Sequence, residues 1–109
     1  MGGRGEAKTA MGAVDNLTLN RWHGMDAVAV LTAFSDRIKL DPTFKPTSSH
    51  LSSRWTAYAA GRDWELLCTG PKFWDTRAEC GGGGAIDLVM HLHRTSFKGA
   101  VALLKDKDL

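Results

Sequence analysis

The chain has 109 residues, of which 43% are apolar and 24% charged, a balance typical of one folded domain and not of a disordered protein. Its 14 lysines and arginines are nearly matched by 12 aspartates and glutamates, so the net charge of +2 excludes overall charge as a sufficient basis for nucleic-acid binding. No apolar run approaches the ~18 residues that a membrane-spanning helix needs. With two cysteines and no secretion signal, we expect a cytoplasmic protein whose cysteines are thiols.

The first segment, residues 1–20, is rich in glycine and shows no sustained period, so we expect a flexible tail followed by a single domain over residues 21–109. After Met25, apolar residues recur at steps of three and four, which predicts an amphipathic helix that ends before Asp41-Pro42. The residues that carry this period are Val28, Leu31, Phe34 and Ile38. The polar, proline-containing segment 43–50 is predicted to be a loop.

Strand patterns follow the loop. Over residues 54–59, Trp55, Ala57 and Ala59 alternate with polar side chains, and residues 64–69 alternate in the same way after a turn at 61–63. Gly70-Pro71 predicts another turn before a third strand over residues 72–76. The middle of the chain is therefore predicted to be a three-stranded antiparallel sheet.

Four glycines at 81–84 precede two predicted helices, one over 85–93 and one after Thr95-Ser96, a pair that suits a helix N-cap. A glycine run before a helix is also a candidate phosphate cradle. However, Asp87 falls in the first helical turn, where it satisfies the helix dipole and would repel a phosphate. We therefore favour a tight connection over a cradle. The predicted fold class is α+β, with an N-terminal helix, a small ribbon-like sheet and two C-terminal helices.

The sequence CGGGGAIDLVMHL at 80–92, followed by SFKGAVALL at 96–104, resembles the end of the zinc-ribbon domain at the N-terminus of bacterial DNA primases. It is more similar still to zinc-less relatives carried by plasmids and integrative elements and often joined to Toprim domains. In these the GGGGAIDL motif follows a Lys-Phe-aromatic strand such as residues 72–74. The resemblance extends over about residues 45–104 and implies contact with single-stranded DNA during replication or transfer of a mobile element.

The resemblance places zinc ligands at positions that this chain does not keep. If Cys80 is the last ligand, the preceding one falls at Arg77, and if His50 is the second ligand, the first falls at Thr47. Cys80 and His50 are thus remnant candidates, and Cys68 would need a rearranged site. We expect no structural zinc and no other cofactor. Aromatic residues are then candidates for a compensating core, namely Trp55, Trp64, Phe73 and Trp74.

Binding of single-stranded DNA requires exposed aromatic rings for the bases and lysine or arginine for the phosphates. Arg54 and Tyr58 share the strand face opposite Trp55. The remaining candidates lie on turns, on the third strand and near the helix junction: Arg62, Lys72, Trp74, Arg77 and Lys98. Each of these is also explained as an ordinary solvated residue. The acidic residues of this region, Asp63, Glu65, Asp75 and Glu79, are interpreted as salt-paired surface.

The leading hypothesis is a non-catalytic module that binds single-stranded DNA and assists a primase, polymerase or helicase of a mobile element. The alternative is a protein-interaction adaptor that docks such a partner without touching DNA, which near-neutral charge and four tryptophans favour. An independent enzyme is not expected, because primer synthesis needs a cluster of metal-binding carboxylates that this chain does not show. We expect neither a membrane nor a small-molecule substrate as partner.

Overall fold

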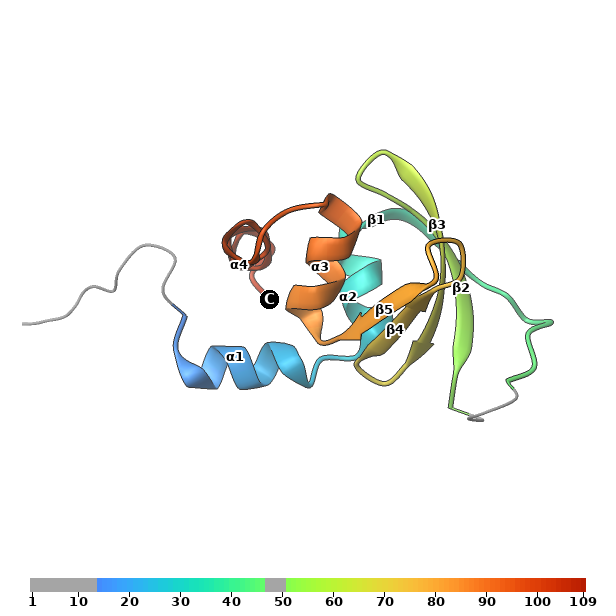
Figure 1. The fold of residues 1–109 in the computed structure, drawn as a ribbon, viewed down its shortest axis with the longest axis horizontal. Coiled ribbons are helices and arrows are strands. Elements are labelled where there is room, and N and C mark those ends of the chain that lie inside the picture. Colours follow the sequence, from blue (N-terminus) through green and yellow to red (C-terminus); the bar gives the residue numbers. More distant parts are fainter. Residues whose placement is uncertain (1–13, 47–50) are drawn as a thin grey trace, which may run out of the picture.

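The computed structural model describes residues 14–46 and 51–109, and it contains two helices, five strands and two further helices in chain order. The strands form one antiparallel meander in the order β1-β2-β3-β4-β5, and the helices lie on one side of it (Figure 1). The mixed α+β class is confirmed, whereas the prediction of three strands is wrong because the sheet has five. The elements are α1 (Asn16–His23), α2 (Ala27–Phe34), β1 (Ser35–Leu40), β2 (Ser53–Ala59), β3 (Arg62–Thr69), β4 (Lys72–Asp75), β5 (Cys80–Gly83), α3 (Ala85–His93) and α4 (Phe97–Asp106).

The predicted N-terminal helix is shorter than its apolar period suggests. Helix α2 ends at Phe34, and Ser35 adopts the extended backbone that starts strand β1. Ile38 therefore points inward from a strand, opposite Ala57, while its neighbours Arg37 and Lys39 are exposed. A residue four positions after Phe34 fits a helical face and an alternating strand equally well, and pairing with β2 decides between them.

The glycine run contributes the fifth strand. Residues 80–83 pair with β4, so that Gly81 lies opposite Trp74 and Gly82 opposite Phe73. Glycine has low strand propensity and no side-chain alternation, so nothing in its own pattern indicates a strand. Gly84 then adopts φ +90°, a backbone conformation that L side chains rarely adopt, and it directs the chain into α3.

The N-terminal helix α1 begins inside the range predicted to be a tail, five residues before the expected domain start. Asp15 caps it by accepting a hydrogen bond from the Thr18 backbone N–H at 2.8 Å. Its Trp22 is almost fully buried, so α1 is part of the core. Residues 1–13 of the predicted tail and residues 47–50 of the predicted loop lie outside the described part of the chain.

The predicted positions of the two C-terminal helices are confirmed. Helix α3 spans Ala85–His93, and Ser96 caps α4 by accepting a hydrogen bond from the Gly99 N–H at 3.1 Å. Their apolar faces close the core against α2 and the sheet, with Leu88, Leu92 and Leu104 fully buried. Within residues 14–46 and 51–109, no helix is both long and apolar enough to cross a membrane.

The aromatic residues proposed as a compensating core divide into two groups. Trp64 and Phe73 are buried on the inner face of the sheet, and Trp55 packs against the core from a partly buried position. Trp74 is 46% exposed, because it alternates with the buried Phe73 and Asp75 and so points away from the helices. It is therefore not a core residue.

Candidate nucleic-acid interface

The open face of the sheet, which none of the described helices covers, holds four of the predicted site residues (Figure 1). Strand alternation places Arg54 and Tyr58 on this face from β2, and Lys72 and Trp74 from β4. Strand β1 adds two cations that the sequence did not indicate, Arg37 and Lys39, because residues 35–40 were predicted as helix. We call these six residues the open-face set.

Two aromatic positions lie at opposite corners of this surface. Trp74 pairs with Leu67, which pairs with Arg54, so these three form a row across the sheet. Tyr58 lies four residues further along β2 from Arg54, which puts the Cα atoms of Trp74 and Tyr58 roughly 16 Å apart at ordinary strand spacing and rise. The guanidinium of Arg37 stacks on the Tyr58 ring at 4.8 Å. A groove of about 420 Å³ runs beside Trp74 and is lined in part by Leu67, Thr69 and Lys72.

Arg54 is held by acidic neighbours on the same face. Its guanidinium is hydrogen-bonded to the Glu65 carboxylate and lies 3.9 Å from Asp41. Hydrogen bonds from Arg54 and then from Thr76 lower the pKa of Glu65, so Glu65 is ionised at neutral pH. The charge of Arg54 is thus offset by two carboxylates, and Arg37, Lys39 and Lys72 are the cations of the open-face set that have no ion-pair partner among the described residues.

The other three predicted residues lie elsewhere. Arg62 starts β3 on the helix side of the sheet, with its guanidinium 5.0 Å from the centre of the Trp64 ring. Arg77 lies in the turn between β4 and β5. Lys98 is exposed on α4, apart from the sheet. The seven residues predicted as one binding surface therefore lie in three places: the open face, the region of Arg62 and Arg77, and helix α4.

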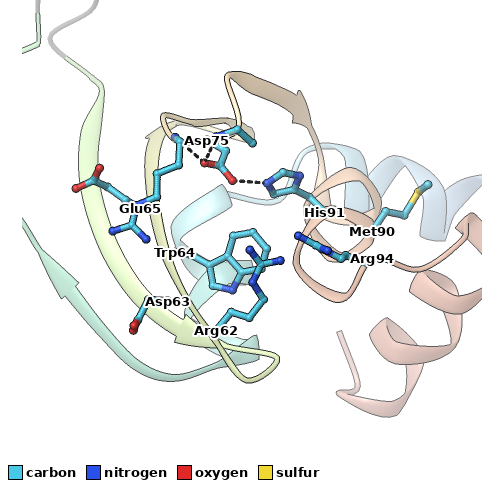
Figure 2. Close-up of a pocket in the computed structure, with 10 residues that line it drawn as sticks. Arg62, Asp63, Trp64, Glu65, Asp75, Met90, His91 and Arg94 are labelled. Carbon is cyan, nitrogen blue, oxygen red and sulfur yellow. Dashed lines mark hydrogen bonds and ion pairs between the residues drawn. The ribbon is translucent and has the colours of Figure 1, made fainter.

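Arg62 and Arg77 line a cavity of about 410 Å³ between the start of β3, the β4–β5 turn and the end of α3. Figure 2 shows this cavity with Arg62, Asp75 and His91 labelled. Asp75, one of the acids interpreted as salt-paired surface, is instead buried in its wall, with 4% exposure. One carboxylate oxygen, Oδ2, lies 2.7 Å from His91 Nε2. The other, Oδ1, accepts hydrogen bonds from the backbone N–H groups of Arg77 at 2.9 Å and Ala78 at 3.0 Å. Asp75 thus closes the turn and joins it to α3.

Burial by itself would raise the pKa of Asp75, yet the hydrogen bonds from His91, Ala78 and Arg77 outweigh it and lower the pKa below its ordinary value. The unfolded chain then takes up this proton at a higher pH, near 3.9, than the folded protein does. The stabilisation is complete above about pH 5 and is lost as the pH falls through the folded-state pKa.

We therefore predict that Asp75→Asn makes the acid side of the stability profile shallower. Urea unfolding followed by circular dichroism between about pH 2.5 and pH 6 measures this. The slope does not vanish, because other carboxylates also have lowered pKa values: Asp15, Asp41 and Glu65. Parallel profiles of the variant and the wild type would contradict the assignment.

The residues present do not fit a zinc ribbon. Cys80 is exposed, whereas Cys68 is buried on the inner face of β3, where burial raises the pKa of its thiol to about 12. Arg77, at the position of the preceding ligand, gives its backbone N–H to Asp75. No group of three or more His, Cys, Asp or Glu side chains suited to a metal occurs in the described part of the chain, and His50 lies outside it. Asp75 makes the bonds that close this turn.

The start of α3 is occupied by its own carboxylate. Asp87 Oδ2 accepts a hydrogen bond from the Gly83 backbone N–H at 3.1 Å. This carboxylate lies where a phosphate at the helix start would have to bind, so it would repel such a ligand. The expectation that the whole glycine run is a connection is wrong, because residues 80–83 form strand β5 and only Gly84 joins the strand to α3.

No family model matches the chain, and no solved structure matches it. A search of curated proteins found similarity to a "65 kDa protein" of Zymomonas mobilis subsp. mobilis, with 53% identity over 36 residues. The match covers 33% of this chain and 6% of that protein. This chain is therefore similar, over one third of its length, to a small part of a much longer protein.

Proposed function

We propose that the protein is a non-catalytic module that binds single-stranded DNA on the open face of its sheet, as an accessory to DNA replication or transfer of a mobile element. The observation that carries the proposal is the exposed Trp74, placed beside Lys72 on a sheet face that no described helix covers. An exposed indole on an open sheet offers a stacking surface for a base, and neighbouring ammonium and guanidinium groups offer contacts for phosphates.

The distribution of charge supports the same conclusion. Arg37, Lys39 and Lys72 lie around the Arg54–Glu65 pair, so cations border the surface on both β1 and β4. Arg37 also covers Tyr58 with a planar guanidinium, on which a base can stack in place of the ring. The resemblance of residues 80–104 to primase-associated domains supports DNA as the ligand over another polyanion.

The test is fluorescence anisotropy of a labelled single-stranded oligonucleotide and its duplex at several salt concentrations. We expect Trp74→Ala to weaken binding of the single strand by about 1–3 kcal/mol, because it removes one stacking contact. Trp74→Phe should restore most of the loss. Phe97→Ala is the matched control, since Phe97 is 48% exposed but belongs to α4, on the helix side of the sheet and not on the open face.

Lys72→Gln tests the phosphate contacts separately. Each phosphate contact on a single strand contributes about 0.7 to the slope of log K against log salt, so this variant should reduce the slope by about that amount. Lys98→Gln, on α4, should leave the slope unchanged. An affinity that is the same at all salt concentrations and for single and double strands would contradict the proposed DNA binding. If such a protein still bound a replication protein, the adaptor function would be favoured instead.

A further inference from the structure

Three arginines line the cavity beside Asp75, and one of them, Arg77, interacts electrostatically with Glu65. Arg62 comes from β3, Arg77 from the β4–β5 turn and Arg94 from the end of α3, and all three line the space. Figure 2 shows Arg62 and Arg94 at the cavity. None of them has an ion-pair partner among the residues of the described ranges. The acids Glu65 and Asp75, which also line the cavity, are already bonded to Arg54 and His91. Arg62 and Arg94, which have no ion-pair partner among the described residues, favour an anionic ligand in this hollow.

We propose that this cavity binds a terminal phosphate group, that is, a phosphate monoester at the end of a DNA strand. A monoester carries a charge of about −1.5 to −2 at neutral pH, more than a phosphate within a strand, and it offers three oxygens to several donors. Guanidinium groups suit it because their planar N–H pairs match phosphate geometry. A volume of about 410 Å³ is large enough for a phosphate and part of its nucleoside.

The cavity is continuous with the open face, which is why a strand end is the source we favour. Asp63, Trp64 and Arg77 line the cavity and also an adjoining groove of about 580 Å³. The groove continues to Arg37, Lys39 and Tyr58 of the open-face set. A strand on this face can therefore place its end among the three arginines. In this respect the inference rests on the proposed function.

Asp63 is the one acid at this junction without a described partner. Its removal should therefore raise the affinity for a phosphorylated end, whereas removal of an arginine should lower it. Its exposed carboxylate lines both spaces, so it repels a phosphate that enters the cavity. Asp63→Asn should tighten binding of a phosphorylated end, while a merely structural role for this region would leave the affinity the same or weaken it.

The experiment compares oligonucleotides of one sequence that carry a 5′-phosphate, a 3′-phosphate or hydroxyls at both ends. We expect the wild type to bind one phosphorylated form about 10-fold more tightly than the hydroxyl form, as one charge-assisted contact allows. Arg94→Gln should bring this ratio close to one, and Lys98→Gln should leave it intact. Trp74→Ala should weaken all three oligonucleotides together without changing the ratio.

Competition with deoxyadenosine monophosphate and with inorganic phosphate separates the sources of the phosphate. If the mononucleotide displaces the phosphorylated oligonucleotide but not the oligonucleotide with hydroxyl ends, the cavity binds the phosphate at the end of a strand. If no oligonucleotide binds, the proposed function fails, and calorimetry with the mononucleotide then decides the cavity by itself: binding that Arg94→Gln abolishes supports it. Equal affinity for all three ends together with no mononucleotide binding overturns the inference.

Discussion

Replacement of Gly81 by alanine should destabilise the fold severely, although the change adds one methyl group at an exposed position. A Cβ at this residue would lie 2.2 Å from the backbone oxygen of Phe73 and 3.1 Å from the Cα of Trp74. Both atoms belong to the backbone of β4, which is held on its other side by β3, so no flexible side chain can move to make room. We expect a loss of about 3 kcal/mol or more.

Gly83→Ala is the matched control within the same strand. Its Cβ would meet only the Lys72 Cγ, at an ordinary 3.7 Å, and its φ is not in the positive region. We expect a change of at most about 1 kcal/mol, of either sign. Urea unfolding of both variants, followed by circular dichroism, measures the difference. Equal stabilities would mean that β5 does not approach β4 as closely as the structure places it.

Asp75→Ala should cost about 3 kcal/mol of unfolding free energy, because one buried carboxylate accepts three hydrogen bonds from two separate elements. The variant leaves the N–H groups of the β4–β5 turn and the His91 ring without their partner. For a domain of this size, such a loss corresponds to a fall in melting temperature of roughly 12–24 °C.

Two controls distinguish this role from a general loss of charge. Asp75→Asn keeps an oxygen for the turn but presents an amide N–H₂ to His91, so its loss should be intermediate. Asp63→Ala removes an exposed acid of the same cavity and should change stability by no more than about 0.5 kcal/mol. If Asp75→Ala and Asp63→Ala had the same melting temperature, the stability of the turn would not depend on the Asp75 carboxylate.

Periodicity was informative wherever side chains differ between the two faces of an element. The alternation of residues 54–59 and 64–69 and the turns at Gly61 and Gly70 were sufficient for β2 and β3, and the three- and four-residue steps were sufficient for α3 and α4. The same signal failed at Ile38, which satisfies both periods, and at residues 80–83, where glycine carries no side-chain pattern.

The candidate site was predictable only in part for a related reason. Alternation along one strand places Arg54 and Tyr58 on a common face, because neighbouring side chains point to opposite sides. It cannot show that Arg37 lies over Tyr58, since that contact depends on the pairing of β1 with β2. Nor can it separate Arg62 and Lys98 from the open face, because their positions depend on the turn into β3 and on α4.

The glycine-rich segment and the helices after it show most clearly which features the sequence determines and which depend on the tertiary structure. The amino-acid sequence determined where α3 and α4 lie, because apolar spacing and the Ser96 cap are local properties of the chain. Only the tertiary structure decided that Cys80 and three of the four glycines form an edge strand, that Asp75 is buried and that three arginines line one cavity. These depend on the docking of α3 against the sheet, which brings together residues 16 positions apart, such as Asp75 and His91.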